Sequence, residues 1–109
     1  MVKKDNLIEP ENLQDKLGED PDFILMDVRE PEEFEICHID GSILVPYSEF
    51  SDHISDFNTN DEYVIVCKKG EKSQKVLEIM QDQGFDNLKM LDGGIMKWAD
   101  SVEKTMEKY

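Results

Sequence analysis

Basic residues, cysteines and long apolar runs are all scarce in this sequence of 109 residues. Its 12 Lys and Arg residues are outnumbered by 26 Asp and Glu residues, and the formal net charge of -14 argues against nucleic acid or an anionic membrane as a partner. No apolar segment is long enough for a signal peptide or a membrane span. With only two cysteines, this predicts a reducing, cytoplasmic setting and a chain that needs no disulfide or metal to fold.

Short apolar runs alternate with amphipathic segments along the chain. The run Phe23 to Val28 is nearly continuous, which is typical of a strand covered on both faces. Strands separated by helices predict an α/β fold in which helices cover both faces of a parallel sheet. The expected strands are 23–28, 42–45, 63–66 and 88–91, and the expected helices are 9–17, 31–35, one from Ser48, 73–83 and one carrying Ile95, Trp98, Ala99 and Val102.

Four lysines lie within eight residues directly after Cys67, which is unexpected in so acidic a chain. Cys67 follows one predicted strand and precedes the helix predicted from Ser73. It therefore lies at the carboxyl end of a strand, where sites of parallel α/β sheets form. Loop N–H groups, a helix N-terminus and nearby lysines all stabilise a thiolate, so we interpret Cys67 as a candidate nucleophile. Gly70 permits backbone angles that other residues resist, whereas Lys75 is expected to be a solvated surface residue.

The segments DVREPEEFEICHIDGSILVP (27–46) and VCKKGEKSQKVLEIMQDQGFDNLKMLDGGIMKW (66–98) resemble the single-domain rhodaneses, a family of sulfurtransferases. The resemblance covers about residues 7–98 of a chain interpreted as one rhodanese-like domain, 1–109, in which 99–109 form the end of a C-terminal helix. It implies a five-stranded parallel sheet flanked by helices. It also implies that Cys67 takes a sulfane sulfur, becomes a persulfide and passes the sulfur to an acceptor, without a metal or an organic cofactor.

The resemblance also implies roles for the residues around the cysteine. A small anionic donor such as thiosulfate, or a persulfide-carrying protein, would be held by the loop, and its lysines would attract the donor into an otherwise repelling field. Asp27 and Arg29 follow a buried strand and are expected to pair with each other or with nearby backbone, as structural support. The loop residues expected to bind substrate are Lys68, Lys69, Gly70, Glu71, Lys72 and Ser73.

The loop departs from the common pattern Cys-Arg-x-Gly-x-Arg-Ser, because Lys68 and Lys72 stand at the two arginine positions. Lysine keeps the charge but lacks the planar fork that binds an oxyanion through two parallel hydrogen bonds. Thiosulfate is therefore expected to be a poor donor, and a catalytically weak binding or regulatory module is the alternative function. A cysteine phosphatase or arsenate reductase is disfavoured, because its loop has an arginine six positions after the nucleophile, where this chain has Ser73.

The second cysteine, Cys37, stands where the rhodaneses that this chain resembles usually have a small residue. We expect a semi-buried side chain there, and a resolving or regulatory thiol is the alternative. The sequence leaves open whether Cys37 comes near Cys67, and it leaves open the oligomeric state.

Overall fold

The computed structural model of the chain describes residues 2–19 and 22–109. Five strands form one parallel sheet in the order β1-β5-β4-β2-β3. The predicted α/β fold with a parallel sheet is thus confirmed. The strands are β1 (Leu7–Ile8), β2 (Phe23–Asp27), β3 (Ile43–Leu44), β4 (Glu62–Val66) and β5 (Leu88–Leu91).

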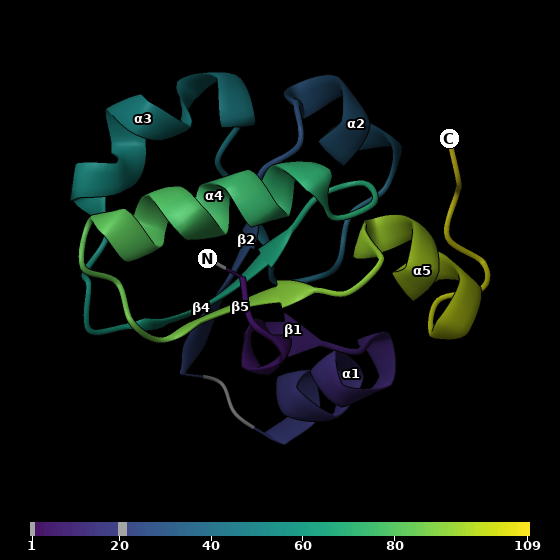
Figure 1. The fold of residues 1–109 in the computed structure, drawn as a ribbon. Helices are drawn as coiled ribbons and strands as arrows, with labels where there is room; N and C mark the ends of the chain where they lie inside the picture. Colours follow the sequence, from purple (N-terminus) through teal and green to yellow (C-terminus); the bar gives the residue numbers. More distant parts are fainter. Residues whose placement is uncertain (1, 20–21) are drawn as a thin grey trace.

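Helices cover both faces of the sheet, as predicted. Figure 1 shows α3 and α4 on one face and α1 and α5 on the opposite face. Across the described ranges, no helix combines the length and the apolar character that a membrane crossing requires. The helices are α1 (Pro10–Glu19), α2 (Pro31–Ile36), α3 (Phe50–His53), α4 (Glu71–Asp82) and α5 (Gly94–Ser101), with single 3₁₀ turns at Lys4–Asn6, Tyr47–Glu49 and Ile54–Asp56.

The central strand β4 explains how the sheet separates two cores. Tyr63 and Ile65 pack into the core beneath α3 and α4, whereas Val64 and Val66 pack into the core against α1 and α5. Successive side chains of a strand point to opposite faces, so an apolar run without polar interruptions fills both cores. Cys67 continues the alternation and belongs to the first core. The strand thereby fixes which side of the sheet the thiol faces.

The structure differs from the sequence prediction at several element boundaries. The edge strand β1 was not predicted, since two residues carry no recognisable periodicity. Helix α4 begins at Glu71 rather than Ser73, and α1 continues through Gly18 to Glu19. The single helix predicted from Ser48 is instead a short α-helix, α3, between two 3₁₀ turns.

The C-terminal segment is also different from the prediction, because it is not a helix end. Helix α5 stops at Ser101, and the following residues turn back toward α2 (Figure 1). Val102 and Met106 pack against the core of α1 and α5, and the Tyr109 hydroxyl contacts Arg29. These tertiary contacts hold the segment against the rest of the domain.

Candidate active site around Cys67

Two backbone N–H groups point at the sulfur of Cys67. Gly70 donates to Sγ at 3.0 Å and Ser73 donates at 3.3 Å. Gly70 reaches this position with a φ of 115°, a left-handed conformation that glycine adopts at little cost, and it caps the first turn of α4. Backbone donors at a helix N-terminus stabilise negative charge, so this loop favours an anionic sulfur at residue 67.

The start of α5 holds the same loop from the other side. Ile95 donates its N–H to the Cys67 carbonyl at 2.9 Å, and Met96 donates to the Lys68 carbonyl at 3.2 Å. This approach requires glycine at residue 94, because a Cβ there would lie 2.3 Å from the Lys68 carbonyl oxygen. Two helix N-termini therefore fix the backbone of the Cys67 loop.

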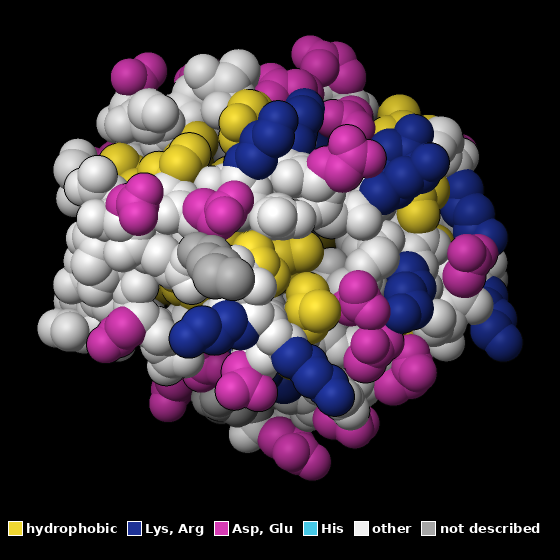
Figure 2. All heavy atoms as spheres, viewed as in Figure 1, with side chains coloured by type: hydrophobic (Ala, Val, Ile, Leu, Met, Phe, Trp, Pro, Cys, Tyr) yellow, Lys and Arg dark blue, Asp and Glu magenta, His cyan; other side chains and the backbone are white. Residues whose placement is uncertain are grey.

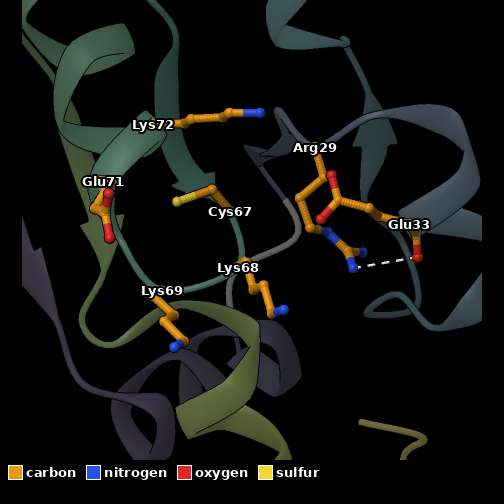
Figure 3. Close-up of a pocket in the computed structure, with 7 residues that line it drawn as sticks. All are labelled: Arg29, Glu33, Cys67, Lys68, Lys69, Glu71 and Lys72. Atoms are coloured by element: carbon orange, nitrogen blue, oxygen red, sulfur yellow. Dashed lines mark hydrogen bonds between the residues drawn. The ribbon is translucent and has the colours of Figure 1, made fainter. Parts of the chain in front are cut away.

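A pocket of about 270 Å³ opens above the thiol. Figure 3 shows Lys72 on one side of Cys67 and Lys68 and Lys69 on the other, with Arg29 and Glu33 facing them across the pocket. Only 2% of Cys67 is exposed, so the pocket is the route by which a small molecule would reach the sulfur. Its lining residues are Arg29, Glu33, Cys67, Lys68, Lys69, Glu71 and Lys72.

The pocket is a basic area on an acidic molecule. Figure 2 shows Lys and Arg side chains near the N-terminal end of α4, whereas Asp and Glu side chains, interspersed with further Lys and Arg side chains, are spread over the rest of that face. Positive charge at a cleft raises the local concentration of anions, even where the net charge of the protein repels them. The lysines therefore favour an anionic ligand at the pocket.

Asp27 and Arg29 form a buried ion pair beneath the pocket. Their side chains are 1% exposed and are joined by an Nη2 to Oδ2 contact of 2.7 Å, with Nε donating to Oδ1 at 3.0 Å. Arg29 also donates from Nη2 to the Cys37 carbonyl at 2.6 Å. Burial acts against the charged guanidinium, but the hydrogen bonds with Asp27 and Tyr109, together with the charge of Asp27, outweigh burial and raise the pKa of Arg29. The pair anchors the β2 to α2 connection, and Arg29 reaches the pocket from it.

The structure places the predicted loop residues in two groups. Lys68, Lys69, Glu71 and Lys72 line the pocket, whereas Gly70 and Ser73 are buried and hold the sulfur through their N–H groups. Each residue was expected at the loop from its position alone. Their roles toward a substrate remain predictions.

Two residues near the pocket were not predicted as site residues. Glu33 lines the pocket from α2, and the Tyr109 hydroxyl donates to its carboxylate at 2.9 Å. Glu33 lies in the segment 27–46 that carries the resemblance, where the sequence predicted only that it belongs to the helix 31–35. Tyr109 is 80 residues from Arg29 in the sequence, and no local pattern could have indicated their contact.

Cys37 is buried at the end of α2, beside Arg29. Its sulfur lies 3.9 Å from Arg29 Nη1. Both cysteines are free thiols, and the residues that line the pocket include Cys67 but not Cys37 in the part of the chain that the structure describes. The arrangement gives the two thiols different access to reagents.

Iodoacetamide is expected to alkylate Cys67 at least about tenfold faster than Cys37, because only Cys67 combines anion-stabilising donors with access from a pocket. The measurement is peptide mass spectrometry after short exposures at neutral pH. In denaturant the two rates should converge, which controls for intrinsic differences between the peptides. Equal rates in the folded protein would contradict the interpretation of the loop.

Comparisons with known proteins agree with this geometry. The family model of the rhodanese-like domain matches residues 9–101, which confirms the resemblance in the sequence. The chain is 33% identical over 108 residues to MoeZ of Mycobacterium tuberculosis, which is named as an adenylyltransferase/sulfurtransferase. It is 32% identical over 93 residues to YrkF of Bacillus subtilis, which is named as a sulfur carrier protein. A crystal structure of a rhodanese-like domain protein from Staphylococcus aureus superposes with a TM-score of 0.80 at 33% identity.

The matches differ in how much of each protein they cover. The MoeZ match covers 97% of this chain but 28% of MoeZ, and the YrkF match covers 85% of this chain and 50% of YrkF. The chain thus spans half or less of these two relatives. The Staphylococcus aureus match covers 89% of this chain and 94% of that protein.

Proposed function

Since the chain belongs to the rhodanese-like domain family, we propose that it is a sulfurtransferase that carries a sulfane sulfur as a persulfide on Cys67. The observation that carries the proposal is the pair of backbone N–H groups, from Gly70 and Ser73, aimed at Sγ in the floor of a basic pocket. The names of MoeZ and YrkF support sulfur transfer as the general function. Both cysteines are free, which suits a reducing compartment such as the cytoplasm.

The proposed chemistry has two displacement steps. In the first, the Cys67 thiolate attacks the outer sulfur of thiosulfate, a new S–S bond forms, and the old S–S bond breaks as sulfite leaves with its electron pair. In the second, a nucleophilic acceptor attacks the outer sulfur of the persulfide and releases the Cys67 thiolate. The loop N–H groups would stabilise the sulfur anion at the start and end of the cycle.

Sulfur transfer from thiosulfate to cyanide tests the proposal directly. The product, thiocyanate, can be measured by its coloured iron complex, and its formation should require the folded protein. A persulfide of a small thiol serves as the second donor, because Lys68 and Lys72 stand where arginine is common. Absence of transfer from both donors would contradict the proposal.

Lys72→Arg is expected to raise kcat/KM for thiosulfate several-fold. Lys72 lines the pocket opposite Lys68 and Lys69, where an arginine could add a second hydrogen bond to the sulfonate end of the donor (Figure 3). A hydrogen bond to a charged group contributes about 1.5–3 kcal/mol, so partial realisation is sufficient for a visible effect. Lys72→Ala should lower the same constant. The quantity to measure is the ratio of kcat/KM for thiosulfate to that for a persulfide donor without a sulfonate.

The matched control is Lys75→Arg, one turn of α4 away and exposed. This variant makes the same lysine-to-arginine change outside the pocket. It should leave the ratio of kcat/KM for the two donors unchanged. If the Lys72 and Lys75 substitutions leave the ratio equally unchanged, Lys72 does not hold the donor. An effect on KM alone would indicate ground-state binding, and an effect on kcat would indicate contact in the transition state.

A catalytically weak binding or regulatory module is the second candidate function. The observation that favours it is lysine at both positions, Lys68 and Lys72, where the rhodaneses commonly have arginine. A persulfide-carrying protein would then dock at the pocket without efficient turnover. Stoichiometric uptake of sulfur by Cys67 without multiple turnovers would favour this function over the first.

A further inference from the structure

The segment after α5 ends against the wall of the Cys67 pocket. Val102, Met106 and Tyr109 are partly buried against the core of α1 and α5. Figure 1 shows this segment running from α5 toward α2, which brings two distant parts of the chain together. Tyr109 contacts three of the residues that line the pocket: Arg29, Glu33 and Lys68.

The Tyr109 hydroxyl connects two charged groups of the pocket. It accepts a hydrogen bond from Arg29 Nη1 at 2.9 Å and donates to Glu33 Oε2 at 2.9 Å. Burial and the hydrogen bond to Glu33 outweigh the opposing effect of Arg29 and raise the pKa of Tyr109 to about 12. The phenol therefore keeps the proton that it donates to Glu33 across the neutral range.

Glu33 is held in its charged form on the other side of this connection. Burial acts to raise its pKa, but hydrogen bonds from the Glu30 backbone and the Tyr109 hydroxyl, with the charge of Lys72, outweigh burial and lower it. At neutral pH, Glu33 is therefore a carboxylate that accepts the hydrogen bond of the Tyr109 hydroxyl beside the pocket. The hydrogen bond from the Tyr109 hydroxyl to Glu33 is thus made at neutral pH.

The ring of Tyr109 also covers one of the loop lysines. Lys68 Nζ lies 4.4 Å from the ring centroid, within the range of a cation–π interaction. Tyr109 therefore holds the ammonium of Lys68 against its aromatic face, and its hydroxyl accepts a hydrogen bond from Arg29 Nη1. Lys69 and Lys72 line the same pocket, and Lys72 lies on the far side of Cys67 from Lys68 (Figure 3).

We propose that Tyr109 is a specificity-determining residue: from behind the pocket lining it holds Arg29, Glu33 and Lys68 in place, and so keeps that side of the pocket narrow. A small donor reaches Cys67 while Tyr109 holds these side chains, whereas a bulky anionic donor reaches it only after the contacts of Tyr109 break and Lys68 is released. The proposal rests on the proposed function only where it says that the incoming molecules are sulfur donors. The steric and electrostatic effect on access to Cys67 is independent of sulfur transfer.

Thiol modification by reagents of two sizes tests the proposal. Iodoacetamide is small and uncharged, whereas dithiobis(nitrobenzoate) is a bulky dianionic disulfide that leaves one thionitrobenzoate on the cysteine and expels the other. Tyr109→Ala should raise the rate of Cys67 modification by the bulky reagent, relative to iodoacetamide, at least about fivefold. Mass spectrometry of the Cys67 peptide keeps Cys37 out of the measurement.

Two further variants separate a local effect from a general one. Tyr109→Phe keeps the ring over Lys68 but removes the hydroxyl contacts, so it should give a smaller rise of the same sign, and it serves alone if Tyr109→Ala fails to fold. Thr105→Ala, at an exposed residue of the same segment, should leave the ratio of rates unchanged. An unchanged ratio in the Tyr109 variants, or an equal acceleration of both reagents, would overturn the proposal. Neither result depends on whether the protein transfers sulfur.

Discussion

Cys67→Ser is expected to abolish sulfur transfer to cyanide while leaving the fold intact. Serine cannot form a persulfide, so the transfer step is lost even though the loop N–H groups keep their positions. The fold should survive because the serine hydroxyl can accept the N–H groups of Gly70 and Ser73, which now point at sulfur, so few buried polar groups lose partners. Thiocyanate formation and the thermal unfolding midpoint are the two measurements.

Cys37→Ala is the matched control for this experiment. Cys37 contacts Arg29 and does not line the pocket, so turnover should persist at a similar level. Residual transfer in Cys67→Ser would refute the assignment of the nucleophile. Loss of turnover in Cys37→Ala without a change in thermal stability would instead give Cys37 the resolving role.

The second large effect is expected at the buried ion pair. Asp27→Asn should lower the free energy of unfolding by about 3–5 kcal/mol, because it leaves the guanidinium of Arg29 buried without its counter-charge. Two carboxylate oxygens of Asp27 face Arg29, and Oδ1 also accepts the Arg29 backbone N–H at 3.0 Å. Equilibrium unfolding in urea measures the change.

Glu9→Gln offers the same carboxylate-to-amide change at an exposed ion pair. Glu9 contacts Lys97 at 3.0 Å, and its side chain is 51% exposed. Exposed pairs contribute about 0–1 kcal/mol, so this variant should differ little from the parent. A loss in Asp27→Asn no larger than that in Glu9→Gln would show that Asp27 and Arg29 do not hold the β2 to α2 connection.

The strands of the sheet were predictable from the sequence where they are buried on both faces, because such strands are nearly continuous apolar runs. Phe23–Asp27 and Glu62–Val66 are of this kind, and the expected runs 23–28 and 63–66 overlap both. The two-residue strand β1 was not found from local pattern, because Leu7 is exposed and Ile8 alone shows no period. Its place in the sheet depends on pairing with β5, a contact between opposite ends of the chain.

The residues of the candidate site also fall into a part that the sequence predicts and a part that only the structure shows. Cys67 and the loop lysines are neighbours in sequence, so their grouping around one strand end was visible without a structure. Glu33 lies only four residues from Arg29, but Tyr109 reaches both residues by contacts that cross most of the chain. The helix predicted for residues 99–109 would have carried Tyr109 away from the site, so the segment's actual path was the information that the sequence lacked.

The central claim is that Cys67 carries a transferable sulfur, and intact-mass measurement tests it most directly. After incubation with thiosulfate or a small-molecule persulfide and removal of the donor, the protein should gain the mass of one sulfur atom. Peptide mapping should place it on Cys67, and cyanide should remove it as thiocyanate. No added sulfur from either donor, or sulfur found on Cys37 instead, would contradict the account.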